Sequence, residues 1–389
     1  MTIYDFDRVI DRRGTDSIKI DNVKAMFGKE NLLPMWVADM DFETPSCIIE
    51  AAMEKIKQPV WGYTKPSNSY WKSIQQWLKR KHALDVNPDE LGFVGGIVPG
   101  LSFAVNALTE KNDGIIIQPP VYPPFHSVVR HSKRELLFNP LIEDNQQFSM
   151  NFAHLPTLLK NKPKMLILCN PHNPGGKVWS KEELISLADF CFDNDILVIS
   201  DEIHADLTLP GYKHTPFASV SEKARMNSIT FMAPSKTFNM AGVASSFYYI
   251  PNPTIRKKFQ DFVLGNDLTG GHLFAYATTQ AAFEKGEEWL LQVLVYINEN
   301  IKFVETYLKK YLPKIKMMRP EASFLIWLDF SETGLSHDQV VEKLKSEAGL
   351  ALNDGISFGK EGTMHMRLNI GTSRSIVEEA LRRMKAAFV

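Results

Sequence analysis

The sequence has few cysteines and no long apolar segment. Three of its 389 residues are cysteine (Cys47, Cys169 and Cys191), and their spacing matches no metal-binding motif. An odd number of isolated thiols favours a reduced intracellular protein over a disulfide framework or a metal site. No apolar run approaches the ~20 residues needed to cross a bilayer, and the N-terminal residues lack the continuous apolar stretch of a signal peptide. We therefore expect a cytoplasmic protein without a membrane segment.

The sequence also lacks an excess of charge of either sign. Lys and Arg number 44 and Asp and Glu number 45, which gives a formal net charge of -1. A nucleic-acid-binding protein of this size needs a strongly basic face, so we expect no nucleic-acid partner. The composition is that of an ordinary globular protein, and the length predicts two domains.

The middle of the chain repeats one pattern: a short apolar run, a turn and an amphipathic helical stretch. A run that is apolar on both faces and is followed by a helix is typical of a mostly parallel sheet covered by helices on both sides. We therefore predict an α/β fold whose large domain spans residues 46–275. The predicted strands lie within residues 114–124, 164–176, 196–204, 228–238 and 245–253.

The pattern changes after residue 275. Residues 287–312 have the periodicity of one long amphipathic helix, 323–330 read as a strand and 377–388 as a closing helix. We predict that this C-terminal part forms a smaller α+β domain. The first 45 residues are irregular and are expected to pack with it, so the small domain comprises residues 1–45 and 276–389.

Polar or aromatic residues follow four of the predicted strands: Tyr122, Asn173, Asp201 and Lys236. Ligands of open α/β sheets bind beyond the carboxyl ends of the strands, so these four side chains should converge. Each alone has an ordinary structural explanation, as a core cap, a turn residue, a helix cap or a solvated cation. Together they match the needs of pyridoxal phosphate (PLP): a lysine for its Schiff base, a carboxylate for its ring nitrogen, a stacking face and a polar partner for its ring hydroxyl.

A possible phosphate site lies upstream. Residues 91–108 read as a strand, a glycine turn and a helix start, so the backbone amides of Gly96, Ile97 and Val98 could receive a phosphate at a helix N-terminus. The stretch matches no established phosphate-loop motif, and a plain tight turn explains its glycines equally well.

Several longer motifs resemble one family. NPHNPGG (170–176), SDEIH (200–204) and APSKTFNMAG (233–242) resemble the fold-type I PLP enzymes of the class I/II aminotransferase superfamily, in the same order and approximate spacing. PMWVADMDF (34–42) and WGYTKP (61–66), together with GGIVPG, resemble the cystathionine β-lyase-like (C–S lyase, MalY/PatB-type) branch. The resemblance covers nearly the whole chain and implies the PLP-transferase fold.

The resemblance implies roles for the strand-end residues. Lys236 would be the Schiff-base lysine and Asp201 the partner of the ring nitrogen. Tyr122 would stack on the ring and Asn173 would bond its hydroxyl, and both would also border the substrate.

Further roles follow from the same resemblance. Arg367 would bind the α-carboxylate of the substrate, beside the backbone of Ala38. Tyr63 would reach the phosphate of a neighbouring subunit's cofactor, which implies a homodimer with active sites at the subunit interface.

The sequence departs from typical aminotransferases at two positions. His204 stands where they carry tyrosine, and Ala244 stands where they carry a phosphate-binding arginine. The phosphate would then depend on backbone amides, on Tyr63 and on hydroxyls such as that of Ser235. The sequence leaves two readings of His204 open: a hydrogen-bond partner of the ring hydroxyl, or a core histidine.

Both departures also resemble the C–S lyase branch. The predicted activity is therefore PLP-dependent β-elimination from cystathionine or another S-substituted L-cysteine, giving a thiol, pyruvate and ammonia. An aminotransferase is the main alternative, since the same lysine serves both reactions. A PLP-binding regulatory protein with residual lyase activity is a third.

Overall fold

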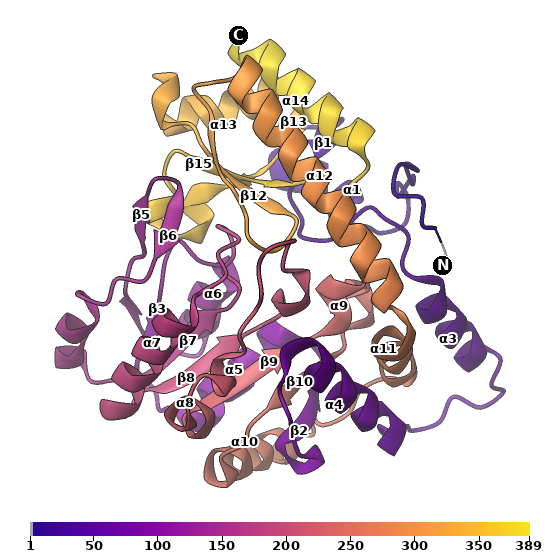
Figure 1. Ribbon diagram of the computed structural model, residues 1–389, viewed down its shortest axis with the longest axis vertical. Coiled ribbons are helices and arrows are strands. Elements are labelled where there is room, and N and C mark those ends of the chain that lie inside the picture. The colour runs from indigo at the N-terminus through magenta and orange to yellow at the C-terminus, as the bar shows by residue number, and fades with distance from the viewer. Residues whose placement is uncertain (1–2) are drawn as a thin grey trace.

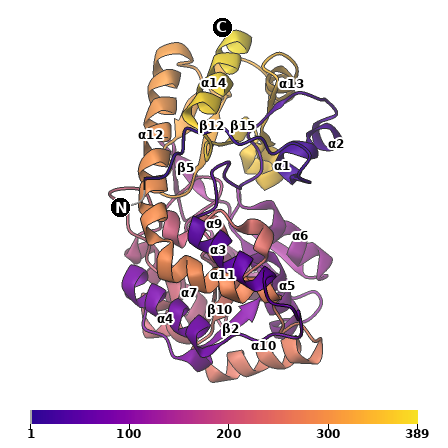
Figure 2. The same ribbon diagram turned by 90° about the vertical axis from the view of Figure 1, so that its right-hand side faces the viewer.

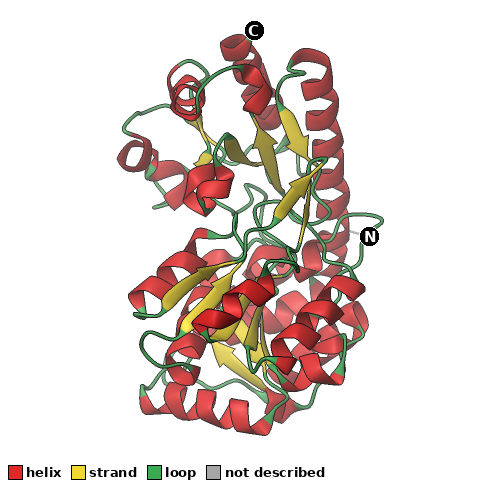
Figure 3. Cartoon of the chain, turned by 90° about the vertical axis from the view of Figure 1, so that its left-hand side faces the viewer, coloured by secondary structure: helices red, strands yellow, loops and turns green. Residues whose placement is uncertain are grey.

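The computed structural model describes residues 3–389 and contains two main β-sheets, which form separate groups of strands in Figure 3. The larger sheet has seven strands in the order β2-β10-β9-β8-β7-β3-β4. Strand β10 runs antiparallel to both of its neighbours, and the other pairs are parallel. This mostly parallel sheet agrees with the sequence prediction. Its strands are β2 (Leu91–Val94), β3 (Gly114–Ile117), β4 (Glu135–Phe138), β7 (Pro163–Cys169), β8 (Leu197–Asp201), β9 (Ser228–Met232) and β10 (Ser246–Tyr249).

Both faces of this sheet are buried under helices (Figure 1). Alternate residues of β7 point to opposite sides: Met165 and Ile167 belong to one apolar cluster, and Leu166 and Leu168 belong to another. This two-sided burial is the reason for the continuous apolar runs in the sequence. The flanking helices are α4 (Asn68–His82), α5 (Ile97–Leu108), α6 (Pro123–His131), α7 (Lys181–Asp193), α8 (Glu222–Met226) and α10 (Pro253–Gly265).

Helix α7 begins as the sequence predicts. The Ser180 side chain accepts a hydrogen bond from the Glu183 amide, and the Glu183 carboxylate accepts one from the Ser180 amide, which together form a capping box. Such local signals fix where the covering helices start and therefore where each βα turn faces.

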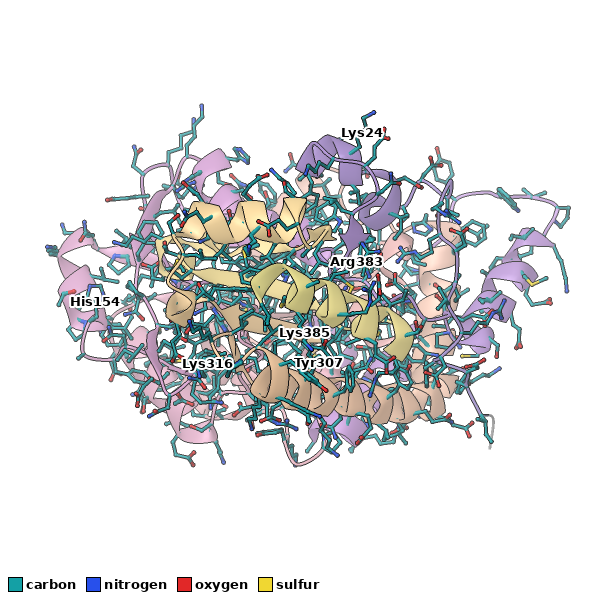
Figure 4. The ribbon with its side chains drawn as sticks, turned by 90° about the horizontal axis from the view of Figure 1, so that it is seen from above. Lys24, His154, Tyr307, Lys316, Arg383 and Lys385 are labelled. Carbon is teal, nitrogen blue, oxygen red and sulfur yellow. The ribbon has the colours of Figure 1, made fainter. Side chains whose placement is uncertain are left out.

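The second sheet has four strands in the order β11-β12-β15-β14, with bounds Lys316–Met318, Leu325–Asp329, His365–Asn369 and Asn353–Asp354. The long helix α12 (Glu287–Tyr311) runs beside α14 (Arg374–Phe388) at this end of the molecule (Figure 1). Seen from above, Tyr307 of α12 and Lys385 of α14 lie along the line where the two helices adjoin (Figure 4). Helix α13 (His337–Ser346) packs nearby.

The N-terminal segment packs at the same end of the molecule as the four-stranded sheet. Strand β1 (Leu33–Pro34) pairs in parallel with β13 (Leu350–Ala351), and Figure 2 shows α1 (Ile18–Asp21) and α2 (Val23–Phe27) on the side of α13. The remaining α-helices are α3 (Ser46–Ile56), α9 (Pro234–Thr237) and α11 (Leu273–Lys285), and the remaining strands form the hairpin of β5 (Ile142–Asp144) and β6 (Gln147–Ser149).

Two further observations concern the sequence expectations. No helix within residues 3–389 is long and apolar enough to span a bilayer. The thiols of Cys47, Cys169 and Cys191 are free.

Candidate active site

The four strand-end residues come from adjacent strands. Strands β9, β8, β7 and β3 are consecutive neighbours in the sheet, and their carboxyl ends lead to Lys236, Asp201, Asn173 and Tyr122. Asp201 is the last residue of β8, whereas Lys236 lies four residues beyond the end of β9, in the one-turn helix α9. The structure thus brings the predicted residues to one edge of the sheet.

The Lys236 amine sits between this edge and the N-terminal segment. Its Nζ donates a hydrogen bond to the Ala38 carbonyl oxygen. Burial lowers the pKa of Lys236 from 10.5 to about 8. The negative charges of Asp39 and Asp201 oppose this shift, whereas the positive charge of Arg367 adds to it. An amine with this pKa is partly neutral near physiological pH and can act as a nucleophile or base.

The Asp201 carboxyl group is buried close by. Burial raises its pKa from 3.8 to about 7; the hydrogen bond from the Ile203 amide, 3.1 Å from Oδ1, opposes this, and the neighbouring Glu202 reinforces it. A cationic ring nitrogen placed against Asp201 would hold this group ionised. Within residues 3–389 the charge of Lys236 acts on this carboxyl group but does not offset its burial, so a cationic ligand placed there would be stabilised.

Arg367 is a buried cation on β15. Its guanidinium donates to the Asn173 side-chain oxygen (3.1 Å), to the Trp36 carbonyl (2.9 Å) and to Asn353 Oδ1 (2.7 Å), and it lies 5.0 Å from the Phe358 ring centroid. Its Nε has no hydrogen-bond partner, and no carboxylate among residues 3–389 forms an ion pair with it. Burial lowers the pKa of Arg367 from 12.5 to about 10.

A buried cation without a counter-ion is unfavourable unless a ligand supplies the negative charge. A planar guanidinium in this position suits a carboxylate.

His204 and Asn173 are also buried in this region. His204 Nδ1 has no hydrogen-bond partner among residues 3–389. Burial lowers the pKa of His204 from 6.5 to about 3, and the charges of Lys236 and Arg367 act in the same direction, so the imidazole stays neutral. The Asn173 amide N–H donates to Cys169 Sγ at 3.3 Å, which fixes the backbone of the turn after β7.

The glycine turn leads into α5, as predicted. Gly96 has a φ of 150°, and the helix begins at Ile97. The first amides of a helix, here including those of Ile97 and Val98, have no intrahelical acceptor. Ala244 lies near this turn, since a Cβ on Gly95 would be 4.0 Å from the Ala244 carbonyl oxygen. The Ala244 methyl group supplies no charge near this turn. Ser235, a predicted phosphate ligand, directly precedes Lys236 in α9.

Tyr63 does not join this cluster within its own chain. Its side chain is fully exposed in the segment between α3 and α4, beside the exposed residues Val60 and Trp61. Its predicted role therefore depends on a second subunit.

Several site-forming residues were not predicted from the sequence. Asn353 holds the Arg367 guanidinium, and Asn239 fixes the N-terminal segment by accepting from the Met40 amide (3.0 Å) and donating to the Phe42 carbonyl (2.7 Å). Asp206 contacts the residue after Lys236. Asn239 lies inside the APSKTFNMAG motif, so the motif could have identified it as a site residue. The contacts of Asn353 and Asp206 depend on the tertiary fold and have no such motif.

An ion-pair cluster in the N-terminal segment was also missed. Arg12 lies 2.6 Å from Asp39 and 2.7 Å from Asp41, and the buried Lys19 amine lies 2.7 Å from Asp41. These pairs fix the loop that carries Ala38 to the Lys236 amine.

Comparison with known proteins gives matches to both C–S lyases and aminotransferases. The chain is 43% identical over 383 residues to cystathionine beta-lyase PatB of Bacillus subtilis strain 168, covering 98% of this chain and 99% of that relative. A protein described as a "PLP-bound putative aminotransferase" from Clostridium difficile 630 superposes with a TM-score of 0.97 at 40% identity, covering 100% of both chains. The PLP-bound C–S lyase of Staphylococcus hominis superposes with a TM-score of 0.92 at 32% identity, covering 100% of this chain and 99% of that one. The model of the family "Aminotransferase class I and II" matches residues 30–384, and the chain belongs to this family.

Proposed function

We propose that this chain is a PLP-dependent C–S β-lyase that cleaves cystathionine or another S-substituted L-cysteine to a thiol, pyruvate and ammonia. One observation carries the proposal: a lysine of lowered pKa, a buried carboxyl group and an arginine with no counter-ion among residues 3–389 share one site. The names of the Bacillus subtilis and Staphylococcus hominis relatives support the lyase class.

The residues present fit the cofactor. Within residues 3–389 the Asp201 carboxyl group forms no ion pair and His204 Nδ1 is buried without a hydrogen-bond partner. The first amides of α5 have no intrahelical acceptor. Asp201 would hold the ring nitrogen and Tyr122 would lie against the ring. Asn173 and His204 would serve the ring hydroxyl.

The phosphate would be bound at the start of α5. The amides of Gly96, Ile97 and Val98 and the hydroxyl of Ser235 would bind it within the chain, and the helix dipole would favour its negative charge. Tyr63 of a second subunit would complete this site. Because two subunits would each supply phosphate ligands, we expect the active form to be a homodimer.

The chain's own residues then account for the reaction. Arg367 binds the substrate's α-carboxylate and so fixes the α-carbon, with the Ala38 backbone on one side. When bound, PLP accepts the electrons released at the α-carbon as its proton leaves. Lys236 Nζ takes that proton, and it can do so because burial has lowered its pKa. The bond between the β-carbon and sulfur breaks, the sulfur leaves as a thiol, and water converts the remaining three-carbon fragment to pyruvate and ammonia.

Amino-group transfer is the second candidate, and the observation that favours it is the family itself, which is named for aminotransferases. Lys236 would then return the proton to a different carbon, and the same site residues would be used. We also propose a cytoplasmic location and a division of the chain into a large domain of residues 46–275 and a small domain of residues 1–45 and 276–389.

The test uses purified PLP-loaded protein and L-cystathionine without any keto acid. We expect sustained, stoichiometric release of pyruvate and free thiol, and loss of both in Lys236→Ala. Amino-group transfer that requires added 2-oxoglutarate or pyruvate, without thiol release, would establish the aminotransferase instead. Full activity of Lys236→Ala would refute the assignment of the site.

A further inference from the structure

Asp206 is a buried carboxylate that contacts α9, the one-turn helix that carries Lys236. It lies in the turn after β8, and its side chain accepts three hydrogen bonds. Oδ2 accepts from Thr237 Oγ1 at 2.9 Å. Oδ1 accepts from Trp77 Nε1 at 3.0 Å and is 2.8 Å from His82 Nε2, both on α4. Asp206 thus ties α4 to the residue that directly follows Lys236.

The carboxylate is kept ionised by these contacts. Burial raises the pKa of Asp206, but the hydrogen bonds from His82, Thr237 and Trp77 outweigh burial and leave the pKa below 3.8. An ionised acceptor forms stronger hydrogen bonds than a neutral one. The bond to Thr237 is therefore a strong and directional anchor.

Helix α9 needs such an anchor. It contains four residues, Pro234–Thr237, and so makes a single turn. One turn of helix has little stability of its own, because fixing its backbone is not repaid by enough internal hydrogen bonds. The Thr237 side chain is fully buried, and its hydroxyl is held from the adjoining turn after β8. The position of α9, and of the lysine on it, depends on contacts of this kind.

We propose that Asp206 and Thr237 are positioning residues: their hydrogen bond sets where the Lys236 amine lies for proton transfer. This inference rests on the proposed function, in which Lys236 takes the α-proton of the substrate. Neither Asp206 nor Thr237 touches the reacting atoms.

The test compares two matched substitutions in the PLP-loaded enzyme. Thr237→Val removes the hydroxyl and keeps the shape of the side chain. Thr230→Val makes the same change in strand β9, where the Thr230 hydroxyl is buried without a hydrogen-bond partner among the described residues. We expect Thr237→Val to lower kcat about 10- to 100-fold with KM little changed, since small displacements of a catalytic group have effects of this size. Thr237→Ser should restore most of the rate, and Thr230→Val should stay close to wild type.

Two readouts separate positioning from general damage to the fold. The kinetic isotope effect of α-deuterated substrate should increase in Thr237→Val, because a misplaced amine makes proton transfer slower relative to other steps. The apoprotein of this variant should also attach added PLP more slowly, followed by the absorbance of the lysine-bound cofactor. If Thr237→Val does not fold, Asp206→Asn is measured in its place, since it keeps the size of the side chain.

The outcomes are distinguishable. An unchanged isotope effect and an unchanged rate of PLP attachment in Thr237→Val, with any loss matched by Thr230→Val, would overturn the positioning role. Full activity of Lys236→Ala would instead overturn the proposed function on which it rests.

Discussion

Arg367 and Asn173 are 194 residues apart in sequence, and the Arg367 guanidinium lies 3.1 Å from the Asn173 side-chain oxygen. Asn173 follows a strand of the seven-stranded sheet, and Arg367 belongs to the four-stranded sheet. The hydrogen bond therefore connects the edge of the seven-stranded sheet to the four-stranded sheet, beside the proposed binding site of the substrate carboxylate.

The first prediction concerns Arg367→Lys. A lysine amine cannot reproduce the planar set of hydrogen bonds to Asn173, Asn353 and a bidentate carboxylate. Loss of one charge-assisted hydrogen bond weakens binding by about 1.5–3 kcal/mol, so KM should rise about 10- to 100-fold. Steady-state kinetics with L-cystathionine measure this. The control is Arg382→Lys, at an exposed arginine of α14, which should leave KM unchanged.

The second prediction concerns the pH dependence of stability in the cofactor-free protein. Burial lowers the pKa of Lys236 from 10.5 to about 8. The unfolded chain therefore binds more protons than the folded chain between these values, and stability rises with pH across this window. Below pH 8 the buried ammonium destabilises the fold in full. Lys236→Met should remove this penalty and stabilise the apoprotein at pH 7 by on the order of 3 kcal/mol.

The measurement is thermal unfolding of wild-type and Lys236→Met apoprotein from pH 7 to pH 10.5. The difference in Tm should shrink as the pH rises, and a constant difference would contradict the assigned pKa. Lys24→Met, at an exposed lysine visible in Figure 4, is the control and should show no such trend.

Much of the fold could be predicted because strong local signals coincide with it. The apolar runs at β7, β8 and β9 and the capping box at Ser180 are local and also agree with the global burial. The antiparallel direction of β10 could not be predicted, because its sequence fits a buried strand of either direction. Pairing direction depends on the connection and on neighbours distant in sequence.

The candidate site shows the same division. The sequence predicts Lys236 at a strand end, whereas the residue lies in the helical turn after β9. Only four residues separate it from the end of β9, so it still lies at the edge of the sheet. The contacts of Asp206 with α4 and of Asn353 with Arg367 have no local signature. They arise from packing between segments far apart in sequence, which periodicity and motifs do not encode.

The third prediction concerns Asp201→Asn. Without the carboxylate the ring nitrogen loses its ionic partner, and kcat should fall about 100-fold, the scale of a lost electrostatic contact in an active site. Burial raises the pKa of Asp201 from 3.8 to about 7, so the folded apoprotein binds more protons between these values and loses stability as the pH rises through them. Asp201→Asn apoprotein should therefore be more stable than wild type at pH 8 but not at pH 4.

Unfolding at the two pH values, together with turnover of the loaded enzyme, checks both parts. Asp85→Asn, at an exposed carboxylate, should change neither. Undiminished turnover in Asp201→Asn would remove this residue from the cofactor site.

The fourth prediction concerns Gly96→Ala. Gly96 has a φ of 150°, which disfavours other residues, and an added Cβ would lie 3.3 Å from Pro99 Cδ. The substitution should distort the start of α5 and weaken PLP binding about tenfold, as loss of about one hydrogen bond would. Equilibrium binding of PLP to the apoprotein measures this. Gly265→Ala, where an added Cβ meets no atom within 4 Å, should bind PLP as wild type does.

The fifth prediction concerns Tyr63, whose side chain is fully exposed in the single chain. If it binds the phosphate in a neighbouring subunit, Tyr63→Phe should weaken PLP binding, whereas Tyr212→Phe at another exposed tyrosine should not. Sedimentation should show a dimer. Mixing Tyr63→Phe subunits with inactive Lys236→Ala subunits then gives a sharper test, because each hybrid dimer would contain one site with both wild-type residues.

When the two variants are mixed in equal amounts, random exchange makes half of the dimers hybrids. Each hybrid has one intact site of two, so the mixture should recover about a quarter of the activity of the same amount of wild type. The assay is run at a low PLP concentration, where Tyr63→Phe subunits alone are largely unloaded. A mixture no more active than the sum of its two components would show that Tyr63 acts within its own subunit or not at all. A monomer in sedimentation would lead to the same conclusion, because the exposed ring would then have no neighbouring site to reach.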